Sequence, residues 1–163
     1  MKNLLRNNYK QSIEHELKDF TPAKNAKILI LFAIILLSTS WLQGANRTWK
    51  TSITSGNWSK GSNWVEGVAP TSTDNVVIGS GKTVSININN AACASLQLSG
   101  TINLNGKTLT SGDLQGSGII TNNATGAALL TVGSGNFAGI IQNNGTGAVS
   151  LTKNGICTLI ITG

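Results

Sequence analysis

The feature that most constrains the fold of this chain is a short stretch of sequence that is written twice. Residues 118–134 read GIITNNATGAALLTVGS and residues 139–155 read GIIQNNGTGAVSLTKNG, so that ten of seventeen positions are identical at a spacing of 21 residues. The dipeptide Leu-Thr recurs at the same spacing, at 109–110, 130–131 and 151–152. A repeat of this length, made of short apolar runs and turn residues, is typical of a solenoid in which each copy forms one coil.

Apolar residues alternate with polar ones, which predicts strands rather than helices. Val84, Ile86 and Ile88 alternate in this way, and so do Leu96 and Leu98. Alternation gives a strand one apolar face and one polar face. The runs are separated by Asn-Asn, Ser-Gly and Asn-Gly pairs, which favour turns. The frequent glycines and β-branched residues also disfavour helix.

We therefore predict an all-β fold, a right-handed parallel β-helix (β-solenoid) with coils of about 21 residues, over residues 76–163. Division by the repeat length gives roughly four to five coils. One coil cannot bury its own apolar row, and a similar neighbour about 4.8 Å away covers it. The predicted structural ladder pairs Ile119 with Ile140, Ile120 with Ile141 and Leu130 with Leu151, and Leu159 and Ile161 are expected in the same apolar set.

The repeated Asn-Asn pair predicts a second kind of ladder, outside the core. Asn122 would stack with Asn143, and Asn123 with Asn144, at a turn. In such a ladder each side-chain amide hydrogen-bonds the next.

The first 45 residues differ in composition from the rest and indicate export. Lys24 and Lys27 precede an unbroken apolar run at 28–37, and small residues follow it. Ten apolar residues match a signal peptide and are short for a membrane span, which needs about 20. Residues 1–45 are thus predicted to be a signal peptide with a long n-region. The alternative is a signal anchor with its apolar core at 28–42.

Both interpretations place the rest of the chain outside the cytoplasm. The chain would contact a membrane only through residues 28–46, and only if they stay uncleaved. Residues 46–163 contain six Lys and Arg and three Asp and Glu. This positive excess is too small for a nucleic-acid-binding surface, which needs clustered Lys and Arg. Nucleic acid is therefore not an expected partner.

Catalytic chemistry is not predicted. The exported part has three carboxylates, Glu66, Asp74 and Asp113, and no His. A glycosidase or lyase on this scaffold needs carboxylates gathered on one face. Asp74, in PTSTDNVVI, is interpreted as a turn residue, and the GSGKT stretch at 79–83 lacks the spacing of a phosphate loop. We expect a chain that is not an enzyme, with no cofactor and no metal.

Residues 46–75 hold Trp49, Trp58 and Trp64 and are predicted to form an N-terminal cap. The open end of a solenoid exposes core and strand edges, which bulky aromatic side chains can cover. The alternative is a carbohydrate contact in which Trp58 and Trp64 are exposed side by side, with Glu66 or Asp74 within reach of the sugar.

Cys93 and Cys157 are predicted to be two unpaired interior thiols. They are 64 residues apart, which is about three coils or about 14 Å along the axis. A disulfide needs Cα atoms within about 7 Å. A bridge, which two cysteines in an exported chain invite, is the alternative.

Residues 135–163 resemble the autotransporter-associated β-strand repeat. Phe137, Gly139 and Ile141 match its opening, and its close is matched by the following residues: Leu151, Thr152, Lys153, Gly155, Thr158, Leu159 and Gly163. Cys157 stands where the second glycine of the close should be, and Ile161 stands for its last Leu. The Trp-rich segment, with PTSTDNVVI and CASLQLSGTINL after it, is also similar to the start of Bacteroidetes surface proteins exported by the type IX route.

This resemblance implies a bacterial protein at the cell surface, in the outer membrane or outside the cell. Its implied role is a structural or adhesin-like passenger module, with the export machinery and an unknown surface ligand or a host or matrix glycan as partners. Neither a β-barrel nor a sorting domain follows Gly163. We thus expect either the front of a longer passenger or an open end that a partner covers. A carbohydrate-binding or polysaccharide-degrading β-helix and a membrane-anchored β-solenoid are the alternative functions.

Overall fold

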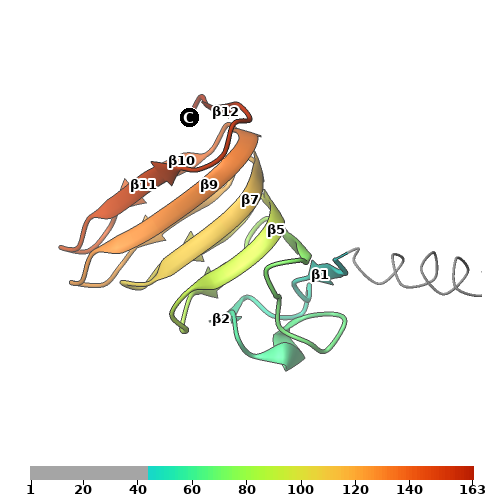
Figure 1. The fold of residues 1–163 in the computed structure, drawn as a ribbon. Helices are drawn as coiled ribbons and strands as arrows, with labels where there is room; N and C mark the ends of the chain where they lie inside the picture. The colour runs from blue at the N-terminus through green and yellow to red at the C-terminus, as the bar shows by residue number, and fades with distance from the viewer. Residues whose placement is uncertain (1–43) are drawn as a thin grey trace, which may run out of the picture. The chain divides into compact units, whose positions relative to one another are not determined.

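The structure is a computed structural model that describes residues 44–163, almost entirely as strands and loops (Figure 1). The predicted signal peptide or anchor, with its apolar core at 28–42, lies outside the described residues. The elements are β1 (Asn46–Thr48), β2 (Ser55–Asn57), a 3₁₀ turn (Gly61–Asn63), β3 (Asn75–Ile78), β4 (Thr83–Ser85), β5 (Ala91–Leu98), β6 (Thr101–Asn103), β7 (Thr108–Gly116), β8 (Ile119–Asn122), β9 (Ala128–Phe137), β10 (Ile140–Asn143), β11 (Val149–Lys153) and β12 (Leu159–Ile161).

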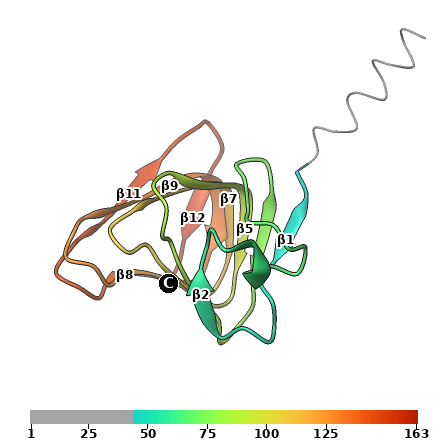
Figure 2. The same cartoon turned by 90° about the horizontal axis from the view of Figure 1, so that it is seen from below.

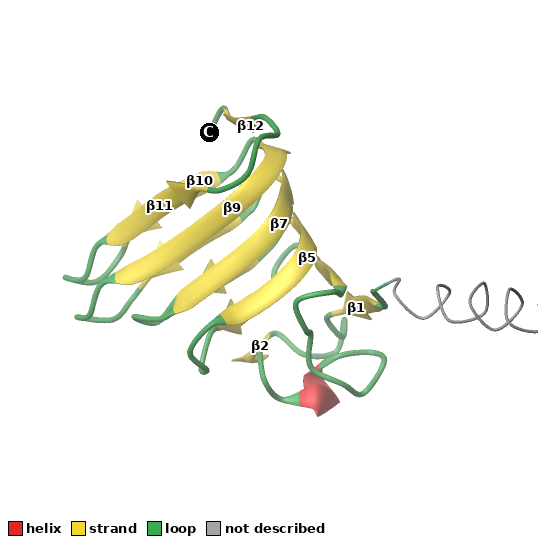
Figure 3. Ribbon diagram, in the orientation of Figure 1, coloured by secondary structure: helices red, strands yellow, loops and turns green. Residues whose placement is uncertain are grey.

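The strands form two sheets in which all the pairings are parallel. One sheet has the order β1-β3-β5-β7-β9-β11, with β12 also paired to β9, and the other has the order β10-β8-β6-β4-β2. Neighbours in a sheet are thus one circuit of the chain apart, and Figures 2 and 3 show these circuits stacked and joined by loops. The prediction of an all-β parallel β-solenoid is confirmed, with about four turns.

The long strands β5, β7 and β9 each bend at a small residue. Cys93 pairs with Ser111 and Ser95 pairs with Asp113, so the register passes over Gly112. A Cβ atom on Gly112 would lie 2.4 Å from the carbonyl oxygen of Ala94, and one on Gly133 would lie 2.4 Å from that of Gly112. Because real Cβ atoms do not approach a carbonyl oxygen so closely, the bend requires glycine in these two coils. We call the stack of Ala94, Gly112 and Gly133 the glycine corner.

Equivalent side chains of successive coils form the columns of the core. Most of their members have no exposed surface, since each is covered by the coils on both sides. The columns are Val84–Ile102–Ile120–Ile141, Ala91–Leu109–Leu130–Leu151, Val76–Leu96–Leu114 and Ile78–Leu98–Gly116–Phe137–Ile161.

The pairings expected from the repeat are present, but one of them lies on the outer face. Ile140 pairs with Ile119, Ile141 with Ile120, and Leu151 with Leu130. Ile120 is fully buried, whereas Ile140 is 48% exposed. Adjacent strand residues point to opposite faces. The Ile119–Ile140 pair therefore cannot share the core with its neighbours, and it contributes an outer apolar pair instead.

The length of the circuit varies along the solenoid. Strands β7, β9 and β11 repeat every 21 residues, but Leu109 follows its partner Ala91 by 18 residues, and Ser95 follows Asn75 by 20. The first circuit is longer, since Asn75 pairs with Asn46. Residues 46–75, predicted as a cap only, therefore also contribute β1 and β2 to the two sheets.

Asn122 differs most from its prediction. Its side chain is fully buried, and its Nδ2 donates to the carbonyl oxygens of Gly126 (2.8 Å) and Gly147 (3.0 Å). Its Oδ1 accepts from the backbone N–H groups of Gly106 (2.9 Å) and Ala124 (3.2 Å). The prediction of an external amide ladder between Asn122 and Asn143 is therefore wrong. One asparagine joins the loops of three successive coils through their backbones.

The second asparagine pair does form an external ladder. The Nδ2 of Asn144 donates to the Oδ1 of Asn123 at 3.1 Å, and both side chains are exposed. Asn143 instead accepts the backbone N–H of Val149 at 2.7 Å, within its own coil.

Replacing Asn122 with Ala tests its role as a link between coils. The change leaves backbone groups in three loops without their partner, and each buried unsatisfied group costs about 1–3 kcal/mol. We expect Asn122→Ala to lower the free energy of unfolding by about 3 kcal/mol, measured by urea denaturation of the full chain. Asn123→Ala is the matched control, and its effect should stay within about 0.5 kcal/mol. Equal effects of the two changes would contradict the assignment.

Candidate functional site

The tryptophans pack against one another inside the first coil. Trp58 and Trp64 have no exposed surface, and Trp49 is 2% exposed. The ring of Trp64 meets Trp49 and Trp58 edge to face, with centroid distances of 5.0 Å and 5.4 Å. The indole N–H of Trp64 donates to the carbonyl oxygen of Trp58 at 2.9 Å, and that of Trp49 donates to the carbonyl oxygen of Ile53 at 2.9 Å.

This packing corrects the carbohydrate alternative of the sequence analysis. A sugar can stack only on an exposed indole face, and both Trp58 and Trp64 are buried. Trp58 instead follows the β2 strand, and its backbone N–H donates to the carbonyl oxygen of Ser85 in the next coil at 2.9 Å. The aromatic cluster thus belongs to the core of the first coil.

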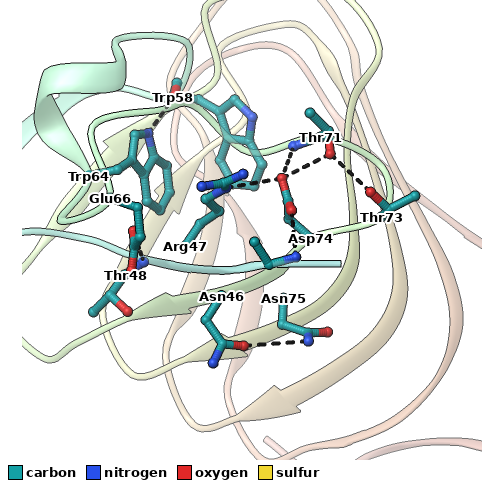
Figure 4. A network of polar contacts seen from close by, with 11 residues as sticks. Asn46, Arg47, Thr48, Trp58, Trp64, Glu66, Thr71, Thr73, Asp74 and Asn75 are labelled. Atoms are coloured by element: carbon teal, nitrogen blue, oxygen red, sulfur yellow. Dashed lines mark hydrogen bonds and ion pairs between the residues drawn. The ribbon is translucent and has the colours of Figure 1, made fainter. Parts of the chain in front are cut away.

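Asp74 is the centre of a polar network beside this cluster (Figure 4). Its Oδ2 accepts from the backbone N–H and the hydroxyl of Thr71, both at 2.8 Å, and from the Nε of Arg47 at 3.1 Å. Its Oδ1 accepts the backbone N–H of Ala45 at 2.9 Å. Asp74 is a turn residue, as its sequence context indicates, and it also ties β1 to the turn that precedes β3.

The network shifts the pKa of Asp74. Burial raises this pKa, but the hydrogen bonds from Thr71, Arg47 and Ala45 outweigh that effect and bring it below its ordinary value of 3.8. The carboxylate is therefore charged and fully engaged in structure. The Arg47 pairing had no sequence signal, because the two residues are 27 positions apart in a stretch without a repeat.

The other two carboxylates, Glu66 and Asp113, also accept hydrogen bonds within the solenoid. Glu66 accepts the backbone N–H of Thr48 at 2.9 Å. Asp113 accepts from the side chains of Gln115 (2.9 Å) and Ser134 (2.8 Å). Among residues 44–163, no three His, Cys, Asp or Glu side chains are grouped so as to hold a metal ion. Each carboxylate therefore has a structural role, and Asp74 and Asp113 also join residues of neighbouring coils.

A shallow hollow of about 170 Å³ follows the glycine corner along the solenoid axis. It exists because Gly112 and Gly133 carry no side chains. Its lining residues are Thr110, Ser111, Gly112, Thr131, Gly133, Asn154 and Gly155. Thr110 pairs with Thr131, so that these two outward-facing threonines form one wall, and Thr152 continues their column beyond the hollow. This hollow was not predicted from the sequence, although the repeated Leu-Thr dipeptide marks its threonine wall.

The two cysteines have different environments and are not bridged. Cys93 is buried and Cys157 is exposed, so the predicted absence of a disulfide holds and the predicted interior position of Cys157 is wrong. Cys157 lies in the loop between β11 and β12. Burial raises the pKa of Cys93 to about 11, although a hydrogen bond to Ser111 acts in the opposite direction.

Comparison of the chain with protein-family models, with curated proteins and with solved structures gives no match. The resemblance to the autotransporter-associated repeat therefore remains a prediction. Within residues 44–163 there is no helix with the length and apolar character needed to cross a membrane.

The pKa of Asp74 predicts how stability depends on pH. Because this pKa is lower in the folded chain than in the unfolded one, its stabilisation is present above about pH 4 and is lost as the pH falls through the folded value. We expect Asp74→Asn to lower the free energy of unfolding by about 2 kcal/mol at neutral pH. When the pH is lowered from neutral to below 4, the melting temperature of the variant should fall less than that of the parent chain. If the melting temperatures of both chains fell equally, Asp74 would not be the source of the acid sensitivity.

Thiol labelling distinguishes the two cysteines. The thiolate is the reactive form, so the exposed Cys157 should react with an aromatic disulfide reagent at about pH 8 while Cys93 stays protected. We expect one thiol per folded chain and two in denaturant, measured by absorbance. Cys157→Ser should abolish the reaction of the folded chain. Rapid labelling of both thiols without denaturant would contradict the burial of Cys93.

Proposed function

We propose that this chain is an exported, non-catalytic β-solenoid protein displayed at the bacterial cell surface, with a structural or adhesin-like role. Its coils would wind in the right-handed sense that parallel crossovers almost always take. A signal peptide at 1–45 would direct export, and a retained anchor at 28–46 is the alternative. The observation that carries the proposal is the parallel register, which repeats outward polar groups from coil to coil.

These outer columns would contact an extended ligand. Thr110, Thr131 and Thr152 form one column, and a second column consists of Gln97, Gln115 and Asn136. Successive members of a column are about 4.8 Å apart. A surface that presents the same hydroxyl or amide at regular steps suits a polymer that has its own repeat, such as a matrix or host glycan.

Export and display are tested on intact cells of the source organism. We expect externally added protease to degrade the chain on intact cells, and N-terminal sequencing of the mature protein to find a start between Trp41 and Asn46. Degradation only after lysis would contradict surface display. An intact N-terminus would support the membrane-anchored alternative.

A carbohydrate-binding role is the second candidate, and the hollow at the glycine corner is the observation that favours it. Ligand pockets usually have volumes of about 300–1,000 Å³, so a hollow of about 170 Å³ suits one weakly held sugar unit or a short part of a chain. Thr131→Val removes a hydroxyl from its wall while keeping the shape of the side chain. Thr101→Val, on a strand of the other sheet, is the matched control. Glycan binding lost in the first variant and kept in the second would support this role; a chain that binds no glycan would exclude it.

A further inference from the structure

The sequence contains three Asn-Gly pairs, at 105–106, 144–145 and 154–155. Asparagine is a chemically labile residue, and it loses its side-chain amide most readily before glycine, which has no side chain to hinder the reaction. The side chains of all three asparagines are exposed. Exposure therefore does not distinguish the three pairs, and the state of the reacting backbone nitrogen has to do so.

The reaction starts at the backbone nitrogen of the glycine. This nitrogen loses its proton to hydroxide and attacks the side-chain Cγ of the asparagine, which forms a new C–N bond. The bond from Cγ to the amide nitrogen breaks, and ammonia leaves after it takes a proton from water. Water then opens the resulting succinimide ring at either carbonyl group. The net change consumes one water, releases one ammonia and leaves aspartate or isoaspartate.

Two of the glycine nitrogens are engaged by the same residue, Asn122. The backbone N–H of Gly106 donates to the Oδ1 of Asn122 at 2.9 Å. The backbone N–H of Gly145 donates to the main-chain carbonyl oxygen of Asn122 at 2.8 Å. A hydrogen bond stabilises the protonated form of its donor, so these nitrogens lose their protons less readily. Asn105 and Asn144 are thus protected.

Gly155 lies in a different setting. The pairing of β11 with β9 ends at Lys153, and the pairing of β12 with β9 begins at Leu159. Residues 154–158 therefore stand opposite residues 133–134 only, and the extra residues leave the sheet as a loop. Among residues 44–163, no backbone carbonyl accepts the N–H of Gly155. This nitrogen is free because its loop lies outside the strand register.

Lys153 favours the loss of the proton from this nitrogen. Its ammonium donates to the carbonyl oxygen of Asn154 at 3.2 Å and to that of Gly155 at 2.9 Å. The carbonyl of Asn154 and the nitrogen of Gly155 belong to one peptide group. A positive charge at that oxygen stabilises the amide anion that forms when the nitrogen is deprotonated. Because Lys153 is exposed, water screens this effect and keeps it small.

We propose that Asn154 is a site of spontaneous deamidation in the folded chain, and that Asn122 protects Asn105 and Asn144 from the same reaction. The product carries a new carboxylate, and isoaspartate also adds a methylene carbon to the backbone. Asn154 lines the hollow at the glycine corner, where none of the other lining side chains is charged. Deamidation thus places a negative charge in this hollow. The reaction does not depend on the proposed surface function.

Peptide mapping by mass spectrometry of the full chain tests the site. The folded chain is kept in mildly alkaline buffer, and the conversion of each Asn-Gly pair to the acid is followed with time. We expect Asn154 to convert about tenfold faster than Asn105 and Asn144, which is the effect of one hydrogen bond on the reacting nitrogen. In the urea-unfolded chain the three pairs should convert at similar rates.

Two lysine variants test the contribution of the ammonium. Lys153→Gln should slow the conversion of Asn154 about threefold, the size of effect expected of an exposed charge. Lys107→Gln is the matched control, because Lys107 directly follows an Asn-Gly pair, and it should leave the conversion of Asn154 unchanged. Equal rates at Asn154 in both variants would exclude the role of Lys153.

The variant Asn122→Ala tests the protection. It removes the side-chain acceptor of Gly106 but keeps the main-chain carbonyl that holds Gly145. The conversion of Asn105 should therefore rise about tenfold, while that of Asn144 stays slow. An equal rise at both asparagines would show that general opening of the loops, and not the hydrogen bond, controls the reaction.

The rates in the folded parent chain decide the main claim. Equal conversion at the three pairs, or fastest conversion at Asn105 or Asn144, would overturn the proposal. It also fails if Asn154 stays intact in the folded chain while the unfolded chain converts. If Asn122→Ala does not fold, the ratio of the folded to the unfolded rate at each pair of the parent chain decides the question.

Discussion

The parallel main-chain register between successive coils is the constraint on which the rest of the structure depends. It places each residue beside its equivalent one circuit away, so a favourable contact made once is made again at every step. Leu109, Leu130 and Leu151 follow one another for this reason, and so do the outward threonines next to them. A single coil has neither a core nor paired backbone groups, and its stability is therefore shared with its neighbours.

The sequence departs from strict repetition where close backbone approach or backbone hydrogen bonding restricts which residue fits. The glycine corner brings main chains too close for a side chain. Phe137 pairs with Gly116, so a large ring lies next to a position without a side chain, and the volume of the column is balanced between coils rather than at each position. Asn122 uses all the hydrogen-bonding capacity of its amide on the backbones of three loops. The buried amide of Asn122 thus holds the backbones of these loops in place.

The sequence predicted the architecture well and the individual environments less well, for physical reasons. Equal loop lengths make the 21-residue period visible at Leu130 and Leu151, whereas the shorter coil between Ala91 and Leu109 hides it. The repeat shows which residues stack but not which face they occupy, and Ile119 was therefore assigned to the core. Asn122 resembles any turn asparagine until the loops around it are placed. The Arg47–Asp74 pair joins residues outside the repeat, where no periodic signal exists.

The asymmetry of the two ends has a consequence for the dynamics of the molecule. In a stack whose units contact only their neighbours, opening starts at the unit with fewest contacts and proceeds one unit at a time. Within residues 44–163, the tryptophan cluster and the Asp74 network secure the first coil, whereas β10, β11 and β12 pair with other strands on one side. Amide protection against hydrogen exchange should thus fall in steps from β5 toward β12. Residues 44–163 by themselves would therefore open from β12 first, and a ligand that bridges the last two of these coils would slow that opening.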